Sequence, residues 1–235
     1  MKKGYISAFQ SLGTVDGPGV RTVVFASGCP LRCGYCHNPE TWCEKGNQIT
    51  VDELFAKIIK YKPYIKNGGV TFSGGEPLMQ SEFFYQLACK LKDENLSVAL
   101  DTSGSFFDNY TDKLLEVCDI ILLDIKFTTE DDYLKYTGGS LKKVLEFLDK
   151  ISKLSKRIFI RQVIIEGIND NYENIDRLKN ILSKYDIEKV EFLPFKKLCK
   201  EKYDNLKINF TFDVFNETSE NTISNINDYY LKAEK

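Results

Sequence analysis

Histidine is nearly missing from this sequence, since His37 is the only one among 235 residues. A metal site made of two or three imidazoles is therefore excluded, and a Ser-His-Asp or Cys-His hydrolase would have to rely on His37 alone. Long apolar runs are missing too: the run inside Asp119–Asp124 is far too short to span a bilayer. A secretory signal has an apolar segment after its basic residues, and no such segment follows the two lysines near the N-terminus. We therefore expect a cytoplasmic protein with no membrane partner.

The sequence also has no large excess of positive or negative charge. Lys and Arg total 32 and Asp and Glu total 34, which gives a formal net charge of -2. No dense basic run is present, so we expect no nucleic-acid partner. The apolar fraction of 43%, with 16 Phe and 13 Tyr, is typical of a folded globular chain. This length allows one sizeable domain with a short appendage.

Short apolar runs rich in β-branched residues alternate with helical patterns. A capping box at Thr50–Glu53 predicts a helix start, and apolar residues at three- and four-residue steps predict a helix within 140–155. This alternation predicts an α/β fold with a parallel sheet or partial barrel, over residues 1–204. Residues 205–235 are polar and weakly patterned, and we assign this tail no role. The six predicted strands are 21–26, 70–73, 97–101, 120–125, 157–164 and 189–193.

Polar and glycine-rich residues follow the predicted strands. Because the carboxyl ends of parallel strands meet at one edge, we expect these residues to share a cavity. Asp101 and Asp124 would lie close together there, and this requires a cation or a strong donor. The segments concerned are 27–37, 73–77, 101–104, 124–126 and 194–196, with Arg161 inside the fifth strand.

Three cysteines fall within eight residues, at Cys29, Cys33 and Cys36. Three thiolates on one tight loop can hold three irons of a [4Fe-4S] cluster and leave the fourth iron open to a substrate or cofactor. The alternative is a zinc site with Cys43 or His37 as the fourth ligand. The usual zinc pattern pairs two separated CxxC knuckles, and the sequence has no second knuckle.

Together these motifs resemble the radical S-adenosylmethionine superfamily, which has CxxxCx-aromatic-C followed by Gly-Gly-Glu-Pro. Within it, the sequence is similar to the glycyl-radical-enzyme activases from about Tyr5 to Tyr203. That family has a partial (β/α)6 barrel, so the resemblance implies this fold. The segments that carry the likeness to the activases are Gly13–Arg21, Cys36–Pro39, Asp101–Gly104 and Leu123–Lys126.

The resemblance implies an oxidoreductase that carries one [4Fe-4S] cluster on the three cysteines. S-adenosyl-L-methionine would chelate the open iron, and its reductive cleavage would give methionine and a 5'-deoxyadenosyl radical. That radical would take hydrogen from a glycine of a glycyl radical enzyme, with no catalytic side chain beyond the cofactors. A flavodoxin or ferredoxin would supply the electron, and the chain would act as a monomer.

The resemblance also implies roles for individual residues. Tyr35 would lie near the adenine, and Gly75 would receive the methionyl ammonium group. Asp101 and Asp124 would hold a monovalent cation near the methionyl carboxylate. The family usually has histidine where this sequence has Lys196, so the inherited role of that position is the least secure. The full set of implied cofactor-binding residues is Tyr35, His37, Gly74, Gly75, Asp124, Ile125, Lys126, Arg161 and Lys196.

The interval between the first motif and Gly-Gly-Glu contains only one further cysteine, Cys43. This favours the short activases over those with a ferredoxin-like insertion, and the expected partner is pyruvate formate-lyase. Two other interpretations remain at this point. One is a radical enzyme with another glycyl enzyme or with a small-molecule substrate such as a deazapurine precursor. The other is a zinc-stabilised module without catalysis.

Overall fold

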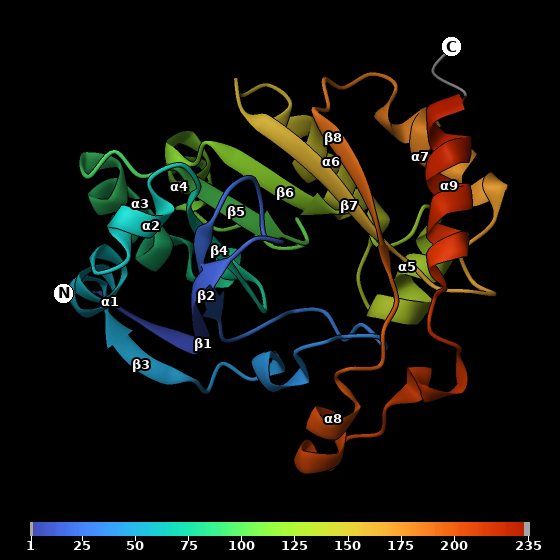
Figure 1. Cartoon of the computed structure of the whole chain (residues 1–235), viewed down its shortest axis with the longest axis horizontal. Helices are drawn as coiled ribbons and strands as arrows, with labels where there is room; N and C mark the ends of the chain where they lie inside the picture. Colours follow the sequence, from blue (N-terminus) through green and yellow to red (C-terminus); the bar gives the residue numbers. More distant parts are fainter. Residues whose placement is uncertain (1, 233–235) are drawn as a thin grey trace.

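One open sheet organises the computed structural model, which describes residues 2–232. Its strands are β1 (Lys3–Gly13), β2 (Arg21–Ala26), β3 (Asn47–Thr50), β4 (Gly69–Gly74), β5 (Val98–Thr102), β6 (Ile120–Asp124), β7 (Arg157–Ile164) and β8 (Lys189–Pro194). Their order across the sheet is β3-β1-β2-β4-β5-β6-β7-β8. The two edge strands, β3 and β8, are not paired with each other, so the barrel is partial (Figure 1).

Six of these strands, β2 and β4 to β8, run parallel, and they confirm the prediction. The predicted boundaries agree with the structure to within one residue. Parallel pairing places Ala26 opposite Gly74 and Asp124 opposite Arg161, so the strand ends come together at one edge. The polar and glycine-rich segments that the sequence analysis singled out follow these strand ends.

The antiparallel strands β1 and β3 were not predicted. Both pair antiparallel, β1 with β2 and with β3. In β1, buried and exposed positions are mixed, and polar Ser7, Gln10 and Ser11 interrupt any apolar run. The four residues of β3 are all at least partly exposed. Strands on this partly solvated edge need no continuous apolar run, so the pattern that predicted the parallel strands missed them.

The helices pack on the sheet mainly through apolar faces. Their bounds are α1 (Val51–Ile59), α2 (Lys62–Ile65), α3 (Ser81–Asp93), α4 (Thr111–Val117), α5 (Glu130–Thr137), α6 (Leu141–Ile151), α7 (Tyr172–Leu182), α8 (Lys200–Leu206) and α9 (Glu220–Lys232), with short 3-10 helices η1 (Pro39–Trp42), η2 (Pro77–Gln80) and η3 (Thr211–Val214). The capping box is confirmed at α1, where the Glu53 N–H donates to Thr50 Oγ1 over 3.2 Å. Within residues 2–232, none of the helices has the length and apolar character needed to cross a membrane.

The C-terminal segment packs against the sheet. Figure 1 shows α9 beside α7 and β8. The Tyr229 ring stacks on Tyr172 with 4.0 Å between centroids, and the Tyr229 hydroxyl bonds Asp176. Ile226 is only 1% exposed. Within residues 205–232, the segment predicted as a polar tail without a role therefore contributes buried side chains to the core.

We expect Ile226→Ala to lower the free energy of unfolding by about 2–5 kcal/mol, because it leaves a cavity between α9 and the sheet. The matched control on the same helix is Leu231→Ala, since Leu231 is 58% exposed. This control should change stability by less than about 0.5 kcal/mol. Urea denaturation followed by circular dichroism measures both. Equal effects of the two substitutions would contradict the packing of α9.

Candidate functional site

The three clustered cysteines lie on residues 27–43, which we call the cluster loop. This loop has little regular structure, and other elements hold its main chain. The N–H of Arg32 donates to the Thr137 carbonyl over 2.8 Å, and the N–H of Gly34 donates to the Tyr136 carbonyl over 2.9 Å. Both carbonyls belong to the end of α5. The loop therefore rests on α5, far away in the sequence.

A cavity of about 100 Å³ opens between the cluster loop and the carboxyl ends of the parallel strands. Its wall contains residues from the loop and from the ends of β4, β5 and β6. The predicted site residues that line it are Cys29, Cys33, Cys36, Gly74, Gly75, Asp101, Asp124 and Lys126. The structure thus brings together residues spread over almost a hundred positions of sequence, at the edge where parallel strands end.

Arg161 and Ile125 lie behind this wall. The Arg161 guanidinium forms ion pairs with Asp101 and, over 3.3 Å, with Asp124. Ile125 is fully buried, and its main-chain N–H donates to the Arg161 carbonyl over 3.0 Å. Arg161 therefore supplies the strong donor that the two aspartates require.

The charges of this wall balance. Lys126 pairs with Asp124 over 3.0 Å, so two cations face two anions. Burial raises the pKa of Asp101, and Arg161 opposes this effect. Burial would also raise the pKa of Asp124, but Lys126 and Arg161 together hold that pKa below its ordinary value. The expected monovalent cation stays a prediction, because Arg161 already relieves the repulsion between the aspartates.

Tyr35 lies in an aromatic cluster and not in the cavity wall. Its ring packs edge-on against Phe127 and Phe212, with centroids 6.0 and 5.5 Å away. Its buried hydroxyl has no hydrogen-bond partner within the part of the chain that is described. The predicted adenine contact of Tyr35 stays a prediction.

His37 and Lys196 contact each other and do not line the cavity. The His37 Nε2 atom lies 2.8 Å from the Lys196 carbonyl oxygen. The Lys196 ammonium turns toward the C-terminal segment, 3.6 Å from the Glu217 carboxylate and 3.4 Å from the Thr218 carbonyl. In this arrangement Lys196 holds the C-terminal segment, and its predicted role in cofactor binding stays a prediction.

The cysteine thiols are shielded from water. Burial raises the pKa of Cys29 to about 12, and the nearby Glu76 carboxylate adds to this effect. Burial also raises the pKa of Cys33 to about 11, although Lys126 opposes it. Thiols of this kind are neutral at ordinary pH, so a metal that binds them must displace their protons.

Glu76 is a site residue to which the sequence analysis gave no role. It is fully buried, and its carboxylate accepts hydrogen bonds from Leu78, Thr102 and Ser103. Burial raises its pKa, while these hydrogen bonds oppose the rise. The sequence feature that could have pointed to Glu76 is its position at a strand end, after two glycines and before a proline. Through these hydrogen bonds, the Glu76 carboxylate ties the end of β5 to the turn after β4.

Gly75 allows the turn after β4 to approach the cluster loop. A Cβ atom at this position would lie 2.2 Å from the Gly28 carbonyl oxygen, so only glycine fits. The same carbonyl accepts the Glu76 N–H over 2.8 Å. The Gly-Gly-Glu turn and the cluster loop therefore form one rigid unit.

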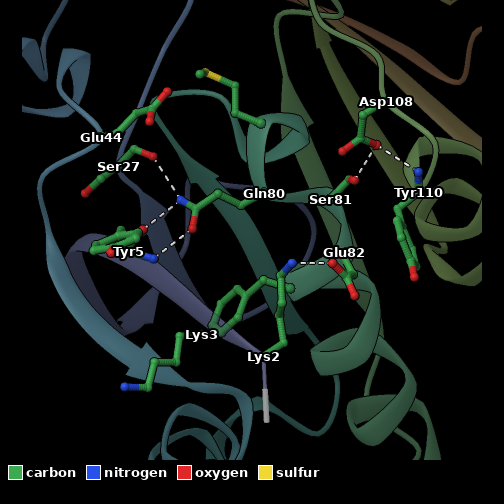
Figure 2. Close-up of a pocket in the computed structure, with 12 residues that line it drawn as sticks. Lys2, Lys3, Tyr5, Ser27, Glu44, Gln80, Ser81, Glu82, Asp108 and Tyr110 are labelled. Carbon is green, nitrogen blue, oxygen red and sulfur yellow. Dashed lines mark hydrogen bonds and ion pairs between the residues drawn. The ribbon is translucent and has the colours of Figure 1, made fainter.

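A second cavity lies beside the start of β1 (Figure 2). The Gln80 amide spans it: the amide oxygen accepts the Tyr5 N–H over 2.7 Å, and the amide nitrogen donates to the carbonyls of Tyr5 and Ser27 over 2.8 and 2.9 Å. Ser81 and Tyr110 both bond Asp108. Because these polar groups bond one another, the residues of this cavity anchor β1 to the beginning of the cluster loop.

The three thiols line one cavity, where they could hold an iron–sulfur cluster. Among residues 2–232, no group of three or more His, Cys, Asp or Glu side chains is arranged around one metal position. A [4Fe-4S] cluster instead places each thiolate on a separate iron. Cys43, a possible fourth zinc ligand, is exposed and does not line the cavity. His37, the other possible fourth zinc ligand, does not line the cavity either.

Comparison with solved structures shows a shared fold. Streptococcus suis SuiB bound to S-adenosylmethionine matches with a TM-score of 0.65 at 14% identity, over 88% of this chain and 46% of that one. A radical SAM methyltransferase from Sphaerobacter thermophilus matches with a TM-score of 0.62 at 16% identity, over 90% and 64%. The profile of the family described as "4Fe-4S single cluster domain" matches residues 15–146. Fold and site together define an iron–sulfur protein of the radical S-adenosylmethionine class.

Two relatives are more similar to this chain in sequence than these solved structures are. The pyruvate formate-lyase-activating enzyme of Clostridium pasteurianum is 42% identical over 214 residues, which cover 89% of this chain and 90% of that protein. The enzyme of the same name from Staphylococcus epidermidis is 41% identical over 224 residues, covering 91% and 89%. The chain belongs to the family of the pyruvate formate-lyase-activating enzymes.

We expect Cys36→Ala to lose most of the iron that wild-type protein holds after anaerobic reconstitution, because one corner of the cluster loses its ligand. Cys43→Ala is the control and should keep about four irons per chain. Iron and sulfide assays measure both. Loss of iron from the Cys43 variant, or full retention by the Cys36 variant, would contradict the assignment of ligands.

Lys196→His should leave the affinity for S-adenosylmethionine unchanged or raise it. The ion pair of Lys196 with Glu217 is partly exposed, so its loss costs less than about 1 kcal/mol. Equilibrium dialysis of reconstituted protein measures the dissociation constant. A tenfold weaker binding would show that Lys196 contacts the cofactor.

Proposed function

We propose that this chain activates a glycyl radical enzyme by removing one hydrogen atom from a glycine α-carbon, and that its partner is pyruvate formate-lyase. The observation that carries the proposal is the cavity at the carboxyl edge of the sheet, where Cys29, Cys33 and Cys36 converge. Membership of the activating-enzyme family, at about 40% identity over about 90% of the chain, supports the choice of partner.

The three cysteines would hold one [4Fe-4S] cluster and leave one iron for S-adenosylmethionine. When bound, this pair supplies one-electron cleavage of a carbon–sulfur bond and hence a carbon-centred hydrogen acceptor. The protein contributes position and shielding. Because Cys33 is buried and Cys29 and Cys36 are partly buried, the protein limits the access of bulk water to the reacting groups.

Lys126 is placed to receive a carboxylate. Its side chain lines the cavity and is 14% exposed, while Asp124 holds it in position. A methionyl carboxylate would gain a charge-assisted hydrogen bond from this ammonium group. Gly74 and Gly75 line the cavity with main-chain atoms, which suit a methionyl ammonium group. Arg161 forms ion pairs with Asp101 and Asp124 behind this contact.

Three further statements belong to the proposal. The electron donor is a flavodoxin or a ferredoxin, the chain works as a monomer, and it works in the cytoplasm. All seven cysteines are free, as is usual in a compartment that keeps thiols reduced. Size-exclusion chromatography with light scattering tests the monomer.

The test of function is electron paramagnetic resonance. Reduced, reconstituted protein and S-adenosylmethionine are incubated anaerobically with pyruvate formate-lyase, and we expect the doublet signal of a glycyl radical. Cys36→Ala and a target whose acceptor glycine is replaced by alanine are the controls, and both should stay silent. Release of 5'-deoxyadenosine without a doublet would contradict the partner, and no release at all would contradict the reaction.

A further inference from the structure

Lys126, which lines the cavity, lies on an irregular segment, residues 125–129, between β6 and α5. Past the end of a strand, the main chain has no continuous ladder, so its buried polar groups need other partners. The Ile125 N–H still pairs with β7, because it donates to the Arg161 carbonyl over 3.0 Å. Ile125 is fully buried, and its carbonyl requires a donor from elsewhere.

The side chain of Gln162, in β7, is that donor. Its amide nitrogen donates to the Ile125 carbonyl over 3.1 Å. Successive side chains of a strand point to opposite faces, so Gln162 lies on the face of the sheet away from Arg161 and its aspartates. Gln162 is only 1% exposed. A buried amide destabilises a protein unless its polar atoms are bonded, so its oxygen also needs a partner.

Asn174, in the first turn of α7, holds this amide and the other end of the segment. Its amide nitrogen donates to the amide oxygen of Gln162 over 2.9 Å. Its amide oxygen accepts the Thr128 hydroxyl over 2.8 Å. Thr128 stands two residues after Lys126. Asn174 therefore fixes both ends of the segment that carries the lysine, directly at Thr128 and through Gln162 at Ile125.

The orientation of the Asn174 side chain is itself fixed. Its amide nitrogen makes a second bond, to the Asn169 carbonyl over 2.9 Å, and the residue is 2% exposed. The Arg177 guanidinium donates to the Thr128 hydroxyl over 3.0 Å, so the hydrogen of that hydroxyl is left for Asn174. The main-chain N–H of Asn174 donates to the side chain of Asn171, which caps α7. All polar atoms of the Asn174 amide are thus bonded, and such a network is rigid.

We infer that Asn174 is a positioning residue for Lys126: it fixes the segment from the helix side of the sheet and so aims the ammonium group at the carboxylate of S-adenosylmethionine. The inference rests on the proposed function, which gives Lys126 this ligand. A charge-assisted hydrogen bond is strong only in good geometry, and supporting residues maintain that geometry. Asn174 does not line the cavity, so it acts on the ligand only through the segment.

The experiment replaces Asn174 with Leu, which has a similar size and makes no hydrogen bonds, and separately Gln162 with Met, which removes only the bond to Ile125. Equilibrium dialysis of anaerobically reconstituted full-length protein measures the dissociation constants. We expect Asn174→Leu to bind S-adenosylmethionine about tenfold more weakly, the effect of about one hydrogen bond to a charged group. Gln162→Met should weaken binding less. Both variants should bind decarboxylated S-adenosylmethionine, which lacks the carboxylate, as wild type does, and should keep their iron.

Leu182→Ala is the matched control. Leu182 is 5% exposed at the end of the same helix, so its loss destabilises α7 and leaves the amide network intact. Its dissociation constant should equal that of wild type. An equal loss of affinity in this control, or for the decarboxylated ligand, would overturn the inference. If Asn174→Leu does not fold, Gln162→Met decides alone, and wild-type affinity there would overturn the inference. A wild-type chain that binds no S-adenosylmethionine would instead overturn the proposed function.

Discussion

The hydrogen bonds that hold the main chain of the cluster loop are the constraint on which the site depends. An irregular loop has no internal ladder, so its buried N–H and carbonyl groups need partners elsewhere. The end of α5 provides carbonyls for Arg32 and Gly34, and the turn after β4 provides the Glu76 N–H for Gly28. Three thiols can keep fixed relative positions only because these distant elements hold the backbone that carries them.

Electrostatic balance is the second constraint. Four ionised groups, Asp101, Asp124, Lys126 and Arg161, share the inner wall, and isolated burial of any of them would cost several kcal/mol. Ion pairs join the two carboxylates and the two cationic side chains into one connected network. The network is neutral as a whole, so a cofactor with its own charged groups can enter without an uncompensated charge. Lys126 is the cation of this network that lines the cavity, beside Asp101 and Asp124.

The parallel strands and the clustering of the three cysteines could be predicted because local sequence determines both. A strand buried on two faces must be apolar throughout, as in 120–124, and Cys29, Cys33 and Cys36 lie close together in any fold because their spacing is short. The strands β1 and β3 lack such a run. The helix α9 has one apolar face among many polar residues, so composition concealed its burial.

The parts of the site that were missed depend on tertiary contacts. Glu76 was visible in the sequence as part of a turn, but three of its four donors come from Thr102 at the end of β5 and from the next residue, Ser103. Trp42 packs edge-on against Tyr203, which lies over 150 residues later in the sequence. No spacing rule connects such positions. Arg161 was recognised as an inward charge in need of a partner, and the fold supplied both aspartates.

The position of the sole indole has a practical consequence. The tryptophan fluorescence of this protein comes from one side chain, which lines the cavity of the cysteines. Iron–sulfur chromophores absorb where tryptophan emits and quench nearby emitters. The assembly and the oxidative breakdown of the metal centre would therefore appear as dimming and recovery of this native emission, in real time and without any attached dye.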